Sequence, residues 1–116
     1  MSRHDDNIRL QHMFDHAMEA TEMARGRKRE ALDIDRQLNL SLVRLLEIVG
    51  EAANHVSPSG QAAMPEIPWA KIIGLRNRIT HGYYEIDFDV LWEIIQHDLP
   101  PLISELEKLI RRDDEL

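Results

Sequence analysis

The stretch that decides the fold is Leu38-Asn39-Leu40-Ser41-Leu42-Val43-Arg44-Leu45-Leu46-Glu47-Ile48-Val49-Gly50-Glu51-Ala52-Ala53-Asn54-His55-Val56. Its apolar residues recur at helical spacing and form one stripe, which consists of Leu38, Leu42, Leu45, Leu46, Val49, Ala53 and Val56. A helix with such a stripe has to bury it against other helices. We expect this helix to run from about residue 29 to 56 and to end at the polar cluster Ser57-Pro58-Ser59-Gly60.

A weaker helical pattern precedes this stretch. Between about residues 7 and 25, one side carries Met13, Ala17, Ala20 and Ala24, with Phe14 and Met18 beside them. Gly26 then offers a stop or a loop. The N-terminal quarter of the chain therefore predicts a helix.

The C-terminal half predicts a loop and two further helical segments. Residues 61–67 read as a loop, and Pro68 suits the first position of a helix that carries Trp69, Ile72, Ile73, Leu75 and Ile79. Gly82 stands where a left-handed residue is wanted. Asp87 can cap a fourth helix with Val90, Leu91, Ile94, Ile95 and Leu99, which Pro100-Pro101 should kink or break before residues 102–110 resume the pattern.

No convincing strand appears in the chain. The expected fold is all-α, an antiparallel bundle of four to five helices forming one domain over residues 1–116. Absence of Cys excludes a disulfide scaffold and thiolate zinc sites. The polar residues 1–6 do not resemble a secretory signal, and no apolar run approaches the ~20 residues that span a bilayer. We expect a cytoplasmic protein without membrane contact.

The formal net charge of −7 argues against a protein that coats nucleic acid. It does not argue against one focused site, and such a site is suggested by Arg76-Asn77-Arg78-Ile79-Thr80-His81-Gly82-Tyr83. Arginine offers a fork of donors that matches phosphate oxygens, and histidine changes charge nearest neutral pH. These side chains could instead be surface or capping groups at a helix end.

For RNA cleavage without a metal or cofactor, the 2′-OH must lose a proton and attack the adjacent phosphorus. His81 could act as general base or acid, Arg76 could stabilise charge on the phosphorane, and Asn77 could orient the phosphate. In one straight helix Arg76 and His81, five residues apart, would diverge by roughly 140°. They could converge if the helix ends near Thr80, or if a second subunit completes a cleft.

Four other features have simpler readings beside functional ones. His12 and His16 are spaced for a metal, which would make a zinc enzyme, but a polar helix face explains them equally. Glu47, Glu51 and Asn54 share one side of the central helix, where they can simply be solvated or Glu51 could pair with the arginines. Gly50 suggests the close approach of another helix, in this chain or across a dimer. The basic residues 25–29 suit an interhelical turn or an RNA contact.

The motif and its surroundings resemble the HEPN superfamily, and within it the HepT-like ribonuclease toxins. The family's mark is Arg, a polar residue, variable positions, His, one residue and Tyr, which here is Arg76-Asn77, His81 and Tyr83. Residues 46–52 and the sequence Pro65-Glu66-Ile67-Pro68-Trp69 match upstream, and Ile86-Asp87 with Trp92 matches downstream. The resemblance covers about residues 5–110.

The resemblance implies a homodimer in which two copies of the motif face one another across a cleft at the interface. It implies a metal-independent endoribonuclease that depends on Arg76, Asn77 and His81, with Arg78 as a possible RNA contact. It further implies a type VII-like toxin–antitoxin system, in which a minimal nucleotidyltransferase antitoxin transfers AMP to Tyr83 or its neighbour Tyr84. The alternative is a non-catalytic module that dimerises and holds a nucleotidyltransferase or nucleotide.

Overall fold

The apolar stripe of residues 38–56 forms the centre of the core. In the computed structural model, which describes residues 3–82 and 85–115 (the backbone alone for 111–115), every residue of the stripe is at most 7% exposed. The alanines predicted on the first helix are buried with it, since Ala17 and Ala20 are 0% exposed. Small side chains let the two helix backbones approach closely, and α1 (Arg3–Ala24) makes its largest contact with α3 (Arg36–Asn54).

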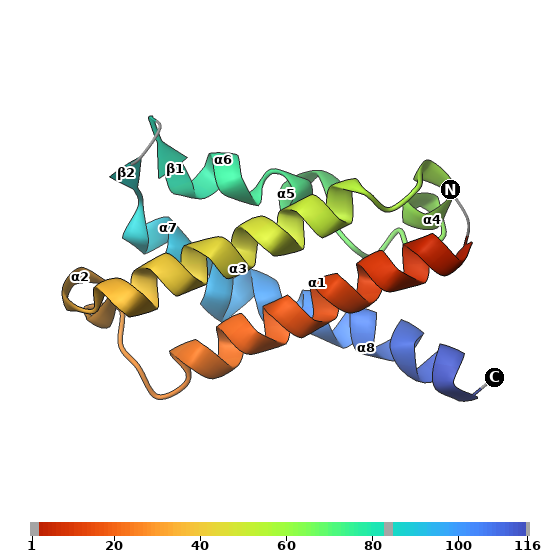
Figure 1. Ribbon diagram of the computed structural model, residues 1–116, viewed down its shortest axis with the longest axis horizontal. Helices are drawn as coiled ribbons and strands as arrows, with labels where there is room; N and C mark the ends of the chain where they lie inside the picture. The colour runs from red at the N-terminus through yellow and green to blue at the C-terminus, as the bar shows by residue number, and fades with distance from the viewer. Residues whose placement is uncertain (1–2, 83–84, 116) are drawn as a thin grey trace.

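The described chain is predominantly helical, as predicted. Between α1 and α3 lies α2 (Ala31–Ile34). After α3 come α4 (Pro58–Ala62), α5 (Trp69–Ile73), α6 (Leu75–Ile79), α7 (Phe88–Glu93), the π-helix η1 (Ile94–Asp98) and α8 (Leu99–Glu115). Two strands of two residues, β1 (Thr80–His81) and β2 (Glu85–Ile86), form an antiparallel pair at one end of the molecule (Figure 1). None of the helices within the described residues is both long and apolar enough to cross a bilayer.

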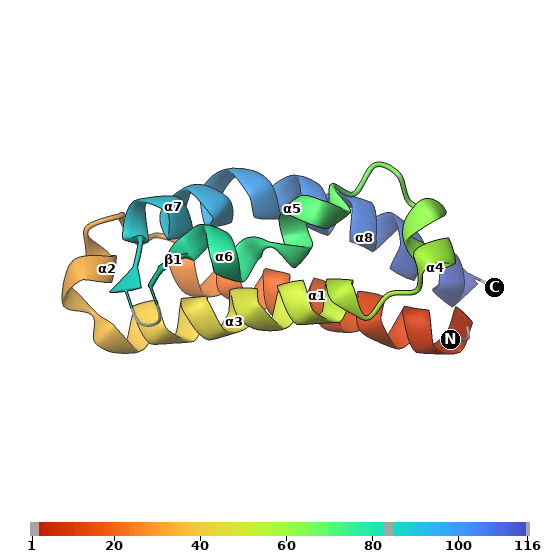
Figure 2. The ribbon, with the colours of Figure 1, turned by 90° about the horizontal axis from the view of Figure 1, so that it is seen from above.

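The helices are arranged around α3. α1 runs antiparallel to α3 and also contacts α8, while α5 and α6 pack on α3 from another side. Figure 2 shows α6 between α3 and the segment made by α7, η1 and α8. The segment that carries the arginine–histidine motif is thus held against the central helix.

The central helix starts later than predicted, at Arg36 rather than near residue 29. Asp35 interrupts it with an extended backbone (φ −108°, ψ 94°) and accepts a hydrogen bond from Leu38 N–H at 3.0 Å. This bond is the main reason that the pKa of Asp35 lies below its usual value, and the hydrogen bond from Arg27 is the next largest cause. An aspartate at this point acts as an N-cap, so the residues before it form the separate turn α2.

The cluster after the central helix ends it, as predicted, but also begins a helix of its own. Ser57 Oγ accepts a hydrogen bond from Gly60 N–H at 3.1 Å, and Pro58 occupies the first turn. Gln61 and Ala62 belong to α4, so the loop begins two residues later than the predicted range of residues 61–67.

The third predicted helix is divided, and the expectation of no strand was wrong. Pro68 lies directly before α5 rather than at its first position, and Gly74 (φ −84°, ψ 9°) separates α5 from α6. Thr80 is extended at the end of α6, where β1 begins. Gly82 has the positive φ predicted for it, 71°, but in the turn between strands rather than at a helix end.

Asp87 caps the fourth predicted helix, as expected, by accepting a hydrogen bond from Val90 N–H at 3.1 Å. Pro100-Pro101 does not break the helical path. A π-turn in η1 directly precedes the prolines, with Leu99 N–H donating to the carbonyl of Ile94, and α8 continues to Glu115. The wider turn accommodates two residues that lack an N–H and would crowd the carbonyls one turn earlier.

Gly50 is explained by a close approach within the chain. A Cβ at this position would lie 3.1 Å from the carbonyl oxygen of Ile72 and 3.5 Å from that of Ile73. The neighbour that needs this space is therefore the backbone of α5. Glycine at this position lets α5 and α6 settle close to α3, which offsets its lower helix propensity.

The buried carboxylate of Asp6 joins two segments that are far apart in the sequence. Its Oδ1 accepts from Ser57 N–H at 2.9 Å and its Oδ2 from the Ser57 hydroxyl at 2.6 Å. Asp6 is only 8% exposed. The start of α1 is thereby fixed to the start of α4, a contact that the sequence patterns did not reveal.

Replacing Asp6 by Ala should lower the free energy of unfolding by about 1.5–3 kcal/mol, because hydrogen bonds to charged groups contribute about this much. Chemical denaturation at neutral pH measures the change. The control is Asp15→Ala, an exposed carboxylate on the same helix, for which a change of about 0.5 kcal/mol or less is expected. Equal losses in the two variants would contradict a structural role for the Asp6–Ser57 contact.

The same contact sets a pH dependence. The hydroxyl and then the amide of Ser57 hold the pKa of Asp6 below its usual value of 3.8, against the opposing effect of burial. A lowered pKa in the folded state means that the contribution is complete above pH 3.8 and is lost as the pH falls through the folded-state value. The stability difference between wild type and Asp6→Ala should therefore shrink only below pH 3.8.

Candidate active site

The short helix α6 presents Arg76 and Asn77 outward because its other face is anchored. Leu75 and Ile79 lie four residues apart on one face, and both are 0% exposed. Arg76 and Asn77, between them in sequence, are both exposed. Within the described residues neither side chain has a hydrogen-bond or ion-pair partner, so both are available to a ligand.

Arg76 and Asn77 share a hollow with the central helix. A pocket of about 190 Å³ is lined by Ile73, Arg76 and Asn77 on one side and by Glu47, Gly50, Glu51 and Asn54 on the other. Glu51 lines this pocket together with Arg76, but the ion pair with the arginines that the sequence allowed does not occur in the described residues. Glu47 is paired with Arg44 at 3.8 Å.

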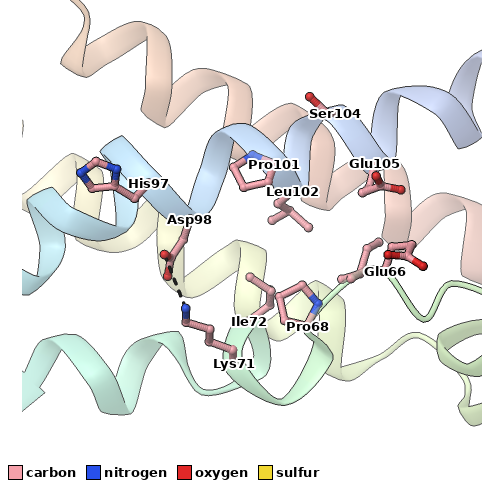
Figure 3. Close-up of a pocket in the computed structure, with 11 residues that line it drawn as sticks. Glu66, Pro68, Lys71, Ile72, His97, Asp98, Pro101, Leu102, Ser104 and Glu105 are labelled. Atoms are coloured by element: carbon pink, nitrogen blue, oxygen red, sulfur yellow. Dashed lines mark ion pairs between the residues drawn. The ribbon is translucent and has the colours of Figure 1, made fainter.

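Arg78 faces the opposite side of α6. Its Nη1 lies 2.7 Å from Asp98 Oδ2, and Lys71 Nζ lies 3.7 Å from Asp98 Oδ1. Figure 3 shows Lys71 and Asp98 pointing toward one another beside a second pocket, of about 530 Å³, between α5 and the η1–α8 segment. The structure therefore separates Arg78 from Arg76 and engages its guanidinium with a carboxylate.

His81 is held by Asp87 across the hairpin. His81 Nε2 lies 3.0 Å from Asp87 Oδ2, while Asp87 Oδ1 accepts the capping bond from Val90 N–H. The backbone of Asp87 is fixed too, because its N–H donates to the carbonyl of Ile79 at 2.8 Å. The imidazole is 62% exposed, so its remaining nitrogen can reach a ligand.

The hydrogen bond from His81 is the main reason that the pKa of Asp87 lies below its usual value, and the Val90 amide adds to the effect. Asp87 is consequently an anion at neutral pH, and an anion can only accept hydrogen bonds. Sequence patterns identified Asp87 as a helix cap and missed its contact with His81. The sequence feature that could have indicated this contact is Gly82, a turn residue between His81 and Asp87.

The motif residues form two groups in one chain. Arg76 and Asn77 line the pocket against α3, and His81 is not among the residues that line it. Of the two ways in which Arg76 and His81 could converge, the structure has the helix ending at Ile79. Tyr83, the predicted modification site, and its neighbour Tyr84 lie outside the described residues.

The remaining sequence candidates have local partners. The Nδ1 of His16 hydrogen-bonds the carbonyl of His12 at 2.7 Å, and no cluster of three or more potential metal ligands occurs among the described residues. In the basic turn, Arg25 pairs with Glu22 and Arg27 with Asp35. Arg29 bridges Asp33 and Asp89. These ion pairs agree with one of the two predicted roles of the arginines, that of an interhelical turn.

Comparisons with known proteins point in one direction. A family model described as "Ribonuclease HepT-like" matches residues 13–109. The "Putative RNase MJ1380" of Methanocaldococcus jannaschii is 29% identical over 92% of this chain and 98% of its own length. The "Probable ribonuclease HepT" of Thermococcus cleftensis is 35% identical over 65% of this chain and 68% of its own. No solved structure matches.

Proposed function

The chain belongs to the HepT-like ribonuclease family, and on this premise we propose that it is an endoribonuclease acting through Arg76, Asn77 and His81. The observation that supports the proposal is their exposure. Arg76 and Asn77 stand free of side-chain partners within the described residues, while the core anchors the helix beneath them. His81 is oriented by a carboxylate and open to solvent.

In the proposed reaction His81 takes the proton from the 2′-OH of the RNA. The 2′ oxygen forms a bond to phosphorus as the bond from phosphorus to the 5′ oxygen breaks. The leaving 5′ oxygen takes a proton from water, and the hydroxide left behind takes the proton that His81 holds. The products are a 2′,3′-cyclic phosphate and a 5′-OH. Arg76 stabilises the charge that builds on the phosphorane oxygens, and Asn77 orients the phosphate.

We propose that a second copy of the chain completes the site. One subunit holds Arg76 and Asn77 in one hollow and His81 beside Asp87, and His81 is not among the residues that line that hollow. A two-fold dimer repeats both groups across its axis. In the proposed dimer, the arginine of one subunit faces the histidine of the other. We accordingly propose a homodimer with a cleft at the interface.

We also propose that the protein is the toxin of a type VII-like toxin–antitoxin pair, acting in the cytoplasm. Its partner would be a minimal nucleotidyltransferase that transfers AMP to Tyr83: the phenol oxygen attacks the α-phosphorus of ATP and pyrophosphate leaves. The adenylyl group adds a negative charge and bulk two residues from His81, where RNA phosphate has to sit. Arg78 would contact RNA only by giving up its bond to Asp98.

Substitution of either central residue should abolish cleavage. Arg76→Ala and His81→Ala are each expected to lower the rate by about 100-fold or more, as the loss of charge stabilisation or of general acid–base catalysis does. A labelled RNA is incubated with a chelator present throughout, and its all-deoxy counterpart should stay uncut. Arg36→Ala and His97→Ala, exposed residues outside the site, serve as matched controls.

Two results would sink this assignment. One is a mutant at either position that cuts RNA like the wild type. The other is a wild-type activity that disappears on chelation, which would indicate metal-dependent chemistry. A wild-type protein that dimerises and binds the nucleotidyltransferase without cutting RNA would instead favour the non-catalytic binding module.

A shared site predicts complementation between inactive mutants. Arg76→Ala and His81→Ala subunits, mixed and allowed to exchange, should recover about a quarter of wild-type activity, because half of the dimers are mixed and one of their two sites is intact. Cleavage is measured before and after exchange. Recovery that never rises above that of the separate mutants would show that each subunit carries a whole site.

Co-expression with the nucleotidyltransferase should add the mass of one or more AMP groups and relieve growth arrest. Intact mass spectrometry measures the increment. Tyr83→Phe is expected to abolish the mass increment. The control Tyr84→Phe, which removes the phenolic hydroxyl of the neighbouring residue, is expected to keep it. The reverse pattern would move the modification to Tyr84.

A further inference from the structure

The two oxygens of the Asp87 carboxylate have different partners. Oδ1 accepts from Val90 N–H at 3.1 Å and closes the first turn of α7, and Oδ2 lies 3.0 Å from His81 Nε2. The backbone of Asp87 is fixed on both sides, because its N–H donates to Ile79 and its carbonyl accepts from Leu91 N–H at 2.9 Å. This carboxylate is therefore a rigid acceptor at the edge of the candidate site.

A rigid acceptor decides which nitrogen of an imidazole carries the proton. Neutral imidazole has one N–H and one lone pair, and a carboxylate offers no hydrogen to donate. The nitrogen that faces Asp87 must therefore be the protonated one. The lone pair is left on Nδ1, on the other side of the ring, where it can reach a substrate hydroxyl.

From this geometry we infer that Asp87 is a positioning residue that fixes the Nε2–H tautomer of His81 and so makes Nδ1 the proton acceptor in RNA cleavage. The inference rests on the proposed ribonuclease activity for its catalytic consequence. The tautomer itself is a property of the folded chain and can be observed without substrate. Once Nδ1 has taken the proton, the same carboxylate stabilises the imidazolium.

Other charges near His81 act less specifically. Glu85 is the cross-strand partner of His81 in the hairpin, so the two side chains project from the same face of the strand pair. Glu85 is exposed and has no hydrogen bond to the imidazole in the described residues. It supplies negative charge without fixing an orientation, and Glu85→Gln is therefore the control for charge alone.

Two substitutions at position 87 separate the tautomer from helix capping, because Asn and Ser both cap about as well as Asp. In Asp87→Asn the amide oxygen keeps the bond to Val90 N–H and the NH₂ group turns to His81. That group donates, so the imidazole must accept through Nε2 and carry its proton on Nδ1. In Asp87→Ser the single oxygen keeps the cap and nothing replaces the acceptor for His81.

The first readout is the imidazole ¹⁵N spectrum at a pH where the ring is neutral. His81 is assigned among the six histidines by the signals missing in His81→Ala. Wild type and Glu85→Gln should show Nε2 as the protonated nitrogen, Asp87→Asn should show Nδ1, and Asp87→Ser should show a mixture. An unchanged tautomer in both Asp87 variants would overturn the inference.

The second readout is the rate of RNA cleavage. Asp87→Ser should lose about 10-fold and Asp87→Asn about 100-fold or more, since the wrong tautomer removes the general base altogether. Both should unfold at nearly the wild-type temperature. A purely structural role predicts the opposite order, because Asn is the closer match in shape.

The outcomes of this experiment and of the proposed function are distinguishable. If His81→Ala cuts RNA like the wild type, the proposed function fails while the tautomer result stands. If His81→Ala is inactive and both Asp87 variants cut at the wild-type rate, the ribonuclease assignment survives and the role of Asp87 is refuted.

Discussion

The burial of one stripe on α3 determines where the other elements lie. α1 covers it from one side and α5 with α6 from another, and the stripe residues are at most 7% exposed. Gly50 allows the carbonyl of Ile72 to lie 3.1 Å from the point where a side chain would begin. Because α6 follows α5 directly, this contact also sets the position of Arg76 and Asn77 over α3. The core and the candidate site are therefore consequences of the same packing.

Carboxylates that accept backbone N–H groups give part of the acidic composition a structural role. Asp6, Asp35 and Asp87 each accept a backbone N–H, from Ser57, Leu38 and Val90 respectively. Negative charge is favourable at helix starts, where backbone N–H groups lack partners. Part of the formal charge of −7 thus satisfies backbone N–H groups of the fold.

Sequence periodicity was sufficient where many residues repeat one signal and insufficient where a single residue decides. The stripe on α3, the alanine face of α1 and the cap at Asp87 were all predictable from spacing and side-chain type. The break at Asp35 was not, because the apolar pattern runs through it and Leu32 before it is buried as well. The two-residue strands are too short to show alternation, and without them the contact between His81 and Asp87 cannot be inferred. The motif singled out Arg76, Asn77 and His81 as candidates. Only the fold shows that the first two line a pocket against α3 while His81 lies beside Asp87.

One oxygen of Asp87 holds His81 and the other caps α7, so the orientation of the imidazole depends on the first turn of that helix. α7 continues directly into η1 and α8, so its first turn is the free end of a long helical run and depends on the cap at Asp87 and on packing. When that turn frays, the oxygen that closes it and the oxygen that holds His81 leave together, while the core around α3 is still intact. The amide of Val90 then exchanges with solvent at the same moment that the imidazole becomes free to rotate. The orientation of His81 therefore depends on one helical turn as well as on the fold as a whole.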